Sequence, residues 1–265
     1  MEMKFEHQGF GKRLGTMLKV DFRRMFTMPL LYIMVGSCLV MPILILVMTT
    51  MMDGSVSVNP QTGVETVVEG FDNTWQAIAS LSGAPMSMDM TGMCNINMLY
   101  FFMAVLVGIF VAGDFRSGYA KNLFTVRAGK GEYVISKTLA CVTGSVLMLL
   151  AFFVGTMLGG AISGLPFDLG AAGVKGLVMC MASKLLLSAV FVPIYLLWSV
   201  AAKQKLWLSL VGSMMTGMLL FMMVPMLTPL DATIMNVVLC LAGGAAFSAG
   251  LGAISSAVLR TTSLV

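Results

Sequence analysis

The sequence predicts an all-α, polytopic membrane protein with six transmembrane helices, an N-terminal amphipathic helix at the membrane interface and both termini in the cytoplasm. Of its 265 residues, 58% are hydrophobic and only 11% are charged, whereas soluble domains carry about 25% charged residues. Apolar stretches of about 20 residues, the length that crosses a bilayer, recur along the chain. Lys and Arg gather between alternate stretches, as they do in cytoplasmic loops. The composition therefore argues against a water-soluble fold.

Residues 4–27, within a predicted cytoplasmic segment of residues 1–28, have the pattern of an amphipathic helix. Their apolar residues recur at the i, i+3, i+4 spacing of one helical face: Leu14, Met17, Leu18, Phe22, Met25 and Phe26. Basic residues occupy much of the remaining circumference: Lys12, Arg13, Lys19, Arg23 and Arg24. We expect this helix to lie in the membrane interface, with its cations directed towards the lipid head groups.

Six apolar spans follow in a predicted membrane domain of residues 29–260. They cover residues 30–51, 97–112, 138–161, 174–200, 206–224 and 233–259. The chain between the first two, residues 52–94, has five acidic residues and no Lys or Arg, so we expect it on the outer side. A short amphipathic helix, resting on the outer leaflet or capping the spans, is predicted there by four apolar residues on one helical face: Phe71, Trp75, Ile78 and Leu81. Residues 261–265 are predicted to form a cytoplasmic tail.

The segment between the second and third spans, residues 113–137, is short and basic. It contains two acidic residues, Asp114 and Glu132, and five basic ones: Arg116, Lys121, Arg127, Lys130 and Lys137. Because Lys and Arg resist translocation, this segment is predicted to be a cytoplasmic loop. Basic residues that lie beside spans indicate contact with anionic lipid head groups rather than with nucleic acid.

The sequence lacks the residues that an enzyme or a nucleotide hydrolase needs. Its single histidine, His7, cannot serve a catalytic triad together with a metal site. No G-x-x-x-x-G-K-[ST] phosphate-binding loop occurs in the chain. Acidic residues are predicted in loops or at span edges, so the membrane-embedded carboxylates of many gradient-driven carriers are also missing. If the chain moves a solute, we expect the energy to come from a separate subunit.

Two motifs in residues 113–137 carry a resemblance to a known family. Residues 113–122 read GDFRSGYAKN, and residues 133–137 read YVISK. Together with the layout of the whole chain, they resemble the permease subunit of bacterial type-2 ATP-binding-cassette exporters. Asp114 stands where that family more often has Glu, and Tyr119 stands where it more often has Thr. The chain length is similar to that of the permeases that export lantibiotics and antimicrobial peptides from Gram-positive bacteria.

The resemblance implies a homodimeric permease of the bacterial cytoplasmic membrane that exports an amphipathic or apolar cargo, such as a peptide, a lipid or a drug-like compound. A partner ATPase would bind ATP and magnesium, and this chain would bind no cofactor. The segment from Arg116 to Arg127 would be the coupling helix that docks on the ATPase, and residues 4–27 would be the connecting helix. The implied coupling residues are Asp114, Arg116, Ser117, Gly118, Tyr119, Lys121, Asn122 and Arg127. The alternative is a loop that is basic only because it is cytoplasmic.

The resemblance also implies that the first, second and fifth spans line the transport pathway, with Met214, Met218 and Phe221 forming an apolar wall. Lys184 lies inside the fourth predicted span, and a charge at that depth is a candidate functional residue. It either faces an aqueous pathway, where it could bind an anionic lipid or substrate group, or snorkels outward to the membrane surface.

An outer cluster of sulfur atoms supplies a separate hypothesis. It consists of Met86, Met88, Met90 and Met93 beside Cys94, and soft sulfur ligands suit Cu(I). Because the chain has 27 methionines, the more ordinary explanation is an adaptable surface for apolar ligands. Two other functions remain as alternatives to ATP-driven export. They are an outer-face receptor or immunity component that binds a peptide without moving it, and a carrier driven by an ion gradient.

Overall fold

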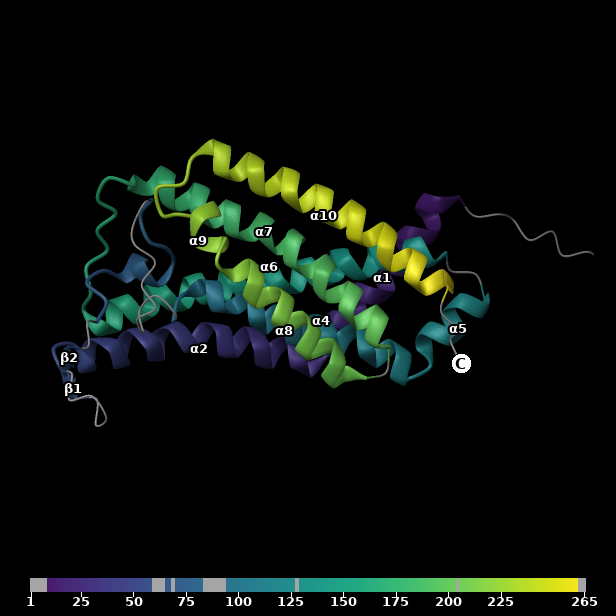
Figure 1. Ribbon diagram of the computed structural model, residues 1–265, viewed down its shortest axis with the longest axis horizontal. Coiled ribbons are helices and arrows are strands. Elements are labelled where there is room, and N and C mark those ends of the chain that lie inside the picture. The colour runs from purple at the N-terminus through teal and green to yellow at the C-terminus, as the bar shows by residue number, and fades with distance from the viewer. Residues whose placement is uncertain are drawn as a thin grey trace, which may run out of the picture.

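The computed structural model describes residues 9–58, 65–67, 70–82, 94–126, 129–203 and 205–261, and its long helices run lengthwise through the molecule (Figure 1). The helices are α1 Phe10–Thr27, α2 Pro29–Met52, α4 Leu99–Arg116, α5 Tyr119–Val126, α6 Lys130–Ser163, α7 Gly173–Ala202, α8 Leu206–Phe221, α9 Val224–Leu227 and α10 Ile234–Thr261. Short 3-10 helices are η1 Thr74–Ala77 and η2 Ile96–Met98. The only strands described, β1 Val56–Val58 and β2 Glu65–Val67, form a small antiparallel ribbon. The predicted helical membrane fold is confirmed.

Five of the described helices are long and apolar enough to cross a membrane: α2, α4, α6, α7 and α10. The remaining predicted span is shorter as a continuous helix. With 16 residues, α8 rises about 24 Å against a hydrocarbon core about 30 Å thick. The chain then turns at residues 222–223 and continues as α9. In sequence, α8 and α9 together cover the predicted span of residues 206–224.

Helix boundaries follow local chemistry. Between α1 and α2, Met28 has an extended backbone, and Pro29 takes the first position of α2, where its missing N–H and fixed φ suit a helix start. Gly118 has a φ of +71° in the turn between α4 and α5, a conformation that glycine adopts without steric cost. Gly164 ends α6 in the same left-handed region.

The segment predicted as a loop, residues 113–137, is mostly helical. Helix α4 continues to Arg116, α5 forms a separate helix, and α6 begins at Lys130. The transmembrane helices therefore extend beyond their apolar cores, because a helix can continue with polar residues once it leaves the hydrocarbon. Arg127 lies outside the described residues.

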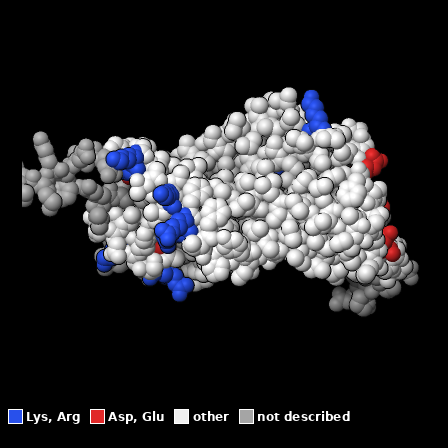
Figure 2. Space-filling model, turned by 180° about the vertical axis from the view of Figure 1, so that it is seen from behind, with Lys and Arg blue, Asp and Glu red and all other residues white. Residues whose placement is uncertain are grey.

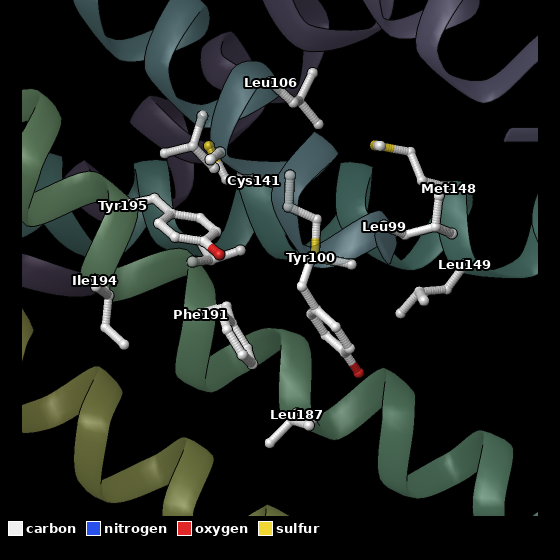
Figure 3. Packing of buried hydrophobic residues seen from close by; sticks show 14 of the residues in the cluster. Leu99, Tyr100, Leu106, Cys141, Met148, Leu149, Leu187, Phe191, Ile194 and Tyr195 are labelled. Carbon is white, nitrogen blue, oxygen red and sulfur yellow. The ribbon is translucent and has the colours of Figure 1, made fainter. Parts of the chain in front are cut away.

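The buried core lies between α4, α6 and α7 (Figure 3). Tyr100 of α4 stacks on Phe191 of α7 with ring centroids 4.5 Å apart, and α6 contributes Met148 and Leu149, both fully buried. In contrast, α2, α8 and α10 expose many large apolar side chains. An exposed apolar face is unfavourable in water but suits helices surrounded by lipid or by another membrane chain.

Two contacts hold the outer helices to this core. A Cβ added at Gly155 of α6 would lie 2.1 Å from the Leu39 backbone oxygen of α2, so the two helices approach closely there. In α7, Pro193 cannot donate the backbone hydrogen bond that Ala189 would normally accept. The Ser248 hydroxyl of α10 donates to that carbonyl at 3.0 Å instead.

The amphipathic helix expected near residues 71–81 is reduced to the single turn η1. Phe71, Trp75 and Ile78 are buried, but Leu81 is 49% exposed. Trp75 packs against Phe153 of α6, with ring centroids 6.0 Å apart. The expected helix is therefore wrong in length, because contacts with other helices, rather than helical periodicity, fix these side chains. Their packing on α6 agrees with the alternative in which this segment caps the spans.

Candidate functional site

Charged residues divide the molecule into two ends. Lys and Arg gather around one end, and Asp and Glu are visible mainly at the other (Figure 2). We name these the basic end, which contains α5, and the acidic end, which contains η1 and the turn between α9 and α10. Lys175, exposed at the start of α7, is an exception at the acidic end.

A cluster of four buried or half-buried charges lies near the basic end, and we call it the four-charge cluster: Asp21, Arg24, Asp114 and Lys137. The Lys137 ammonium lies 2.7 Å from the Asp21 Oδ1 and 2.7 Å from the Asp114 Oδ2. The Arg24 Nη2 lies 2.7 Å from the Asp114 Oδ1. Asp114 and Lys137 have no exposed side-chain surface. The cluster joins α1, α4 and α6 through charge pairs.

Two hydroxyl groups complete the cluster. The Tyr133 hydroxyl donates to the Asp114 Oδ2 at 2.9 Å, and the Ser136 hydroxyl donates to the Asp21 Oδ2 at 2.5 Å. All four carboxylate oxygens therefore have a cationic or hydroxyl partner. Such complete pairing is what makes a buried set of charges tolerable, since an uncompensated buried charge is strongly destabilising.

The cluster also contacts α5. The Arg24 guanidinium lies 4.2 Å from the centre of the Tyr119 ring at the start of α5, close enough for a cation–π interaction. Phe124 of α5 meets the Tyr133 ring edge-on at 5.3 Å. Burial alone would lower the pKa of Arg24, but the combined effect of Asp114, Tyr119 and Asp21 raises the pKa above the ordinary arginine value. Arg24 therefore stays cationic between Asp114 and Tyr119.

Two further contacts tie neighbouring helices at this end. The Arg13 Nη2 of α1 lies 3.0 Å from the Glu132 Oε1 of α6. The Lys130 ammonium donates to the Leu259 carbonyl oxygen at 2.6 Å, near the C-terminus of α10, where carbonyl groups lack helical partners and favour a cation. Motion at α6 would therefore affect both α1 and α10.

The structure divides the predicted coupling residues into two groups. Arg116, Ser117, Lys121 and Asn122 are exposed around the start of α5, and Gly118 forms the turn before it. Tyr119 faces Arg24. Asp114 is fully buried and ion-paired, so among the predicted coupling residues it offers no surface to a partner chain. Its chemistry is directed inward, towards α1 and α6.

Sequence reasoning missed the partners of Asp114. Arg24 and Lys137 were interpreted only as cytoplasmic cations, and no role was assigned to Asp21. One signal was available, because Asp21 falls four residues after Met17 and four before Met25, and these three are the buried residues of α1. An acid within the buried face of a basic helix indicates a buried cationic partner.

Lys184 is fully buried, so the snorkelling interpretation is wrong. Its ammonium donates to the Asn97 Oδ1 at 2.7 Å and to the Thr228 Oγ1 at 2.8 Å. Among the residues predicted to form an apolar wall, Met214 and Met218 are exposed on α8, whereas Phe221 packs against Phe101 with ring centroids 5.2 Å apart.

Metal binding gains no support within the described ranges. No group of three or more His, Cys, Asp and Glu side chains is arranged there to hold a metal ion. The residues of the copper hypothesis, Met86, Met88, Met90 and Met93, lie outside the described residues, and Cys94 is a free, half-buried thiol.

Comparison with known proteins identifies the family. Residues 17–222 match the model of a family described as ABC-2 family transporter protein, a match that covers more than three quarters of the chain. No curated protein and no solved structure matches the chain in two further comparisons. The family match includes α1 from residue 17 onward, the four-charge cluster, α5 and the helices through α8. The chain therefore belongs to the ABC-2 transporter family, as a multi-pass membrane permease that is not itself the catalytic component.

Proposed function

We propose that the chain forms a homodimer that exports an amphipathic or apolar cargo across a bacterial cytoplasmic membrane, driven by a separate ATPase that docks on α5. The ATPase binds ATP and magnesium, and the permease binds no cofactor of its own. The family match supports an ATP-hydrolysing partner in general terms. The positive-inside rule supports a cytoplasmic location for the basic end, where α5 lies.

The observation that carries this proposal is the contact between α5 and the four-charge cluster. The outer surface of α5 and its preceding turn offers Arg116, Lys121 and Asn122 to a partner. Its inner surface contacts Arg24 through Tyr119 and Tyr133 through Phe124. Both routes converge on Asp114. A push on α5 would therefore reach three helices through short, charge-assisted contacts rather than through a flexible loop.

The charge pairs suit this role because their charged atoms lie only 2.7 Å apart. Buried and partly buried charge pairs are screened much less than exposed ones, so they attract each other strongly. Lys137 contacts both Asp21 and Asp114, so α1 and α4 are held to the same atom of α6. In this proposal α1 is the connecting helix, and it moves together with α4 and α6 when the ATPase changes state.

The cargo proposal rests on the surface of α8. Met214 and Met218 of α8 and Met222 just after it are all more than 40% exposed, and methionine forms adaptable, polarizable surfaces. In a homodimer such a surface would line a pathway that selects by shape and apolar burial. The proposed cargo class is an amphipathic molecule, such as an antimicrobial peptide of the lantibiotic type.

The docking proposal is tested by purifying the tagged full chain from its native cells in mild detergent and identifying co-purified proteins by mass spectrometry. We expect an ATPase with a G-x-x-x-x-G-K-[ST] loop to co-purify with the wild type. The Arg116→Glu/Lys121→Glu variant should lose it, because both side chains are exposed beside α5.

The matched control is Lys175→Glu, which reverses the charge of an exposed lysine at the start of α7, at the acidic end, and should retain the ATPase. If the α5 variant also retains it, α5 is not the docking helix. If no ATPase co-purifies with the wild type, the result favours a peptide receptor or a gradient-driven carrier over an ATP-driven permease.

A further inference from the structure

The second buried charge site surrounds Lys184 and lies towards the acidic end. Lys184 belongs to α7, Asn97 to η2 just before α4, and Thr228 follows α9. The Lys184 ammonium is the donor in both contacts, at 2.7 Å to Asn97 and 2.8 Å to Thr228. A single side chain therefore connects three segments that are far apart in sequence.

Both acceptors are themselves held in place. The Thr228 hydroxyl donates its own hydrogen to the Val224 carbonyl oxygen at 2.9 Å, so its lone pairs are free for Lys184. The Asn97 backbone N–H donates to the Asn95 Oδ1 at 3.0 Å. In addition, the Tyr100 hydroxyl donates to the Lys184 carbonyl oxygen at 3.0 Å. Lys184 thus meets pre-arranged partners on both sides.

The type of partner distinguishes this site from the four-charge cluster. None of the ion pairs among the described residues includes Lys184, and its two acceptors are neutral. A cation inside the membrane is costly, and a purely structural contact could be made by apolar residues at lower cost. Neutral acceptors also release a cation more readily than a carboxylate does. These properties suit a contact that opens.

The turn between α9 and α10 is the segment that this contact secures. The same turn is fastened from the other side, since the Asp231 Oδ1 accepts from the Ser82 backbone N–H at 2.8 Å and from its hydroxyl at 2.7 Å. The Leu230 N–H donates to the Ser80 carbonyl oxygen at 2.8 Å. Among the described residues, Lys184 is the only cation whose side chain makes a hydrogen bond to this turn.

We infer that Lys184 is the latch of a gate at the acidic end. In the closed state its ammonium holds the start of α4 and the α9–α10 turn against α7. Release of Asn97 and Thr228 lets α8 and α9 part from α4, which opens the acidic end of the pathway. The inference rests on the proposed function only in its claim that this opening accompanies transport, because the latch itself can be tested on the permease alone.

The test is hydrogen–deuterium exchange of the full-length permease in lipid nanodiscs, read by mass spectrometry. Lys184→Met keeps an unbranched side chain, one heavy atom shorter, and removes its hydrogen-bond donors. We expect exchange to accelerate by about tenfold or more, as for the loss of a hydrogen bond to a charged group, in peptides covering both residues 94–100 and 224–232. Lys175→Met, which removes an exposed lysine from the same helix, should leave both peptides unchanged.

Peptides covering residues 130–140 at the basic end distinguish a latch from general destabilisation. Acceleration there as well, to the same degree, would overturn the inference, and so would unchanged exchange at either acidic-end segment. If Lys184→Met does not fold, Thr228→Val provides the second variant, and it should accelerate exchange in residues 224–232 while sparing residues 130–140. Failure of the ATPase to co-purify leaves this result unaffected, so the two proposals fail separately.

Discussion

At the scale of single residues, Asp114 is the residue on which the basic end depends. Its carboxylate forms ion pairs with Arg24 and Lys137 and accepts a hydrogen bond from Tyr133, and it belongs to α4 while its partners belong to α1 and α6. Two acids and two bases make the four-charge cluster neutral when all four are ionised. An apolar core could be as stable as this cluster, so we attribute to the charges a role in fixing how α1, α4 and α6 are oriented.

Replacing this carboxylate should therefore be costly. We expect Asp114→Asn to lower the free energy of unfolding by about 3–5 kcal/mol, the usual cost of removing one partner of a buried ion pair, because Arg24 loses its counter-charge and Lys137 loses one of its two. Thermal unfolding of the purified permease in detergent measures this as a lower Tm.

The matched control is Asp72→Asn, which neutralises an exposed carboxylate and should shift Tm much less. Exposed charge contacts contribute only about 0–1 kcal/mol. An equal shift in the two variants would contradict the structural role assigned to Asp114.

At the scale of secondary structure elements, α6 organises the bundle. Its first turns carry Glu132, Tyr133 and Lys137, which bind α1 and α4. In its later turns, α2 packs closely against Gly155 and Gly159. The η1 segment packs against Gly160, where an added Cβ would meet Thr74. A movement of α6 at the basic end would therefore be carried along α2 to the acidic end.

The α2–α6 contact gives a prediction for the packing of these helices. Gly155→Ala should lower the free energy of unfolding by about 1–3 kcal/mol, as overpacking does, because the new methyl group would meet backbone atoms of Leu39 that cannot rotate away. Thermal unfolding measures the change.

Gly250→Ala in α10 is the control, since an added Cβ there has nothing within 4 Å. It should leave Tm unchanged or raise it slightly, because alanine favours helices over glycine. A Gly155→Ala variant as stable as the wild type would show that α2 and α6 can move apart without loss of stability, which would contradict the prediction.

At the scale of the whole molecule, the separation of charge between the two ends predicts the orientation in the membrane, with the basic end in the cytoplasm. The basic end carries α5 and the four-charge cluster, and the acidic end carries the Lys184 latch. The site proposed to receive the ATPase and the gate proposed to open are thus at opposite ends of the same helices. This arrangement allows a displacement of α5 at the basic end to be transmitted along the helices to the proposed gate at the acidic end.

Orientation is tested by cysteine labelling of intact cells with a membrane-impermeant maleimide, in a Cys94→Ser background that removes the only half-buried thiol among the five cysteines. We expect Lys175→Cys to react from outside and Lys121→Cys to react only after permeabilisation, because both positions are exposed but lie at opposite ends. The reverse pattern would contradict a cytoplasmic α5.

Local sequence properties were sufficient to predict the long membrane helices and α1. The lengths of the apolar stretches predicted the membrane helices, and the 3.6-residue spacing of apolar residues predicted α1. These predictions succeed because hydrophobic length and helical periodicity are properties of consecutive residues. They were less accurate near Trp75, where a residue pattern typical of a helix became one turn, because contacts with Phe153 and Phe167 fix that segment.

The sequence by itself determined the membrane class, the approximate spans and the basic helix α1. Only the tertiary structure decided that Asp114 faces inward, that Asp21 pairs with Lys137 and that Lys184 contacts Asn97 and Thr228. The physical reason is that a charge pattern along the chain indicates which side of the membrane a segment occupies. Which buried charges meet depends on helix packing, which brings together residues more than a hundred positions apart, as with Asp21 and Ser136.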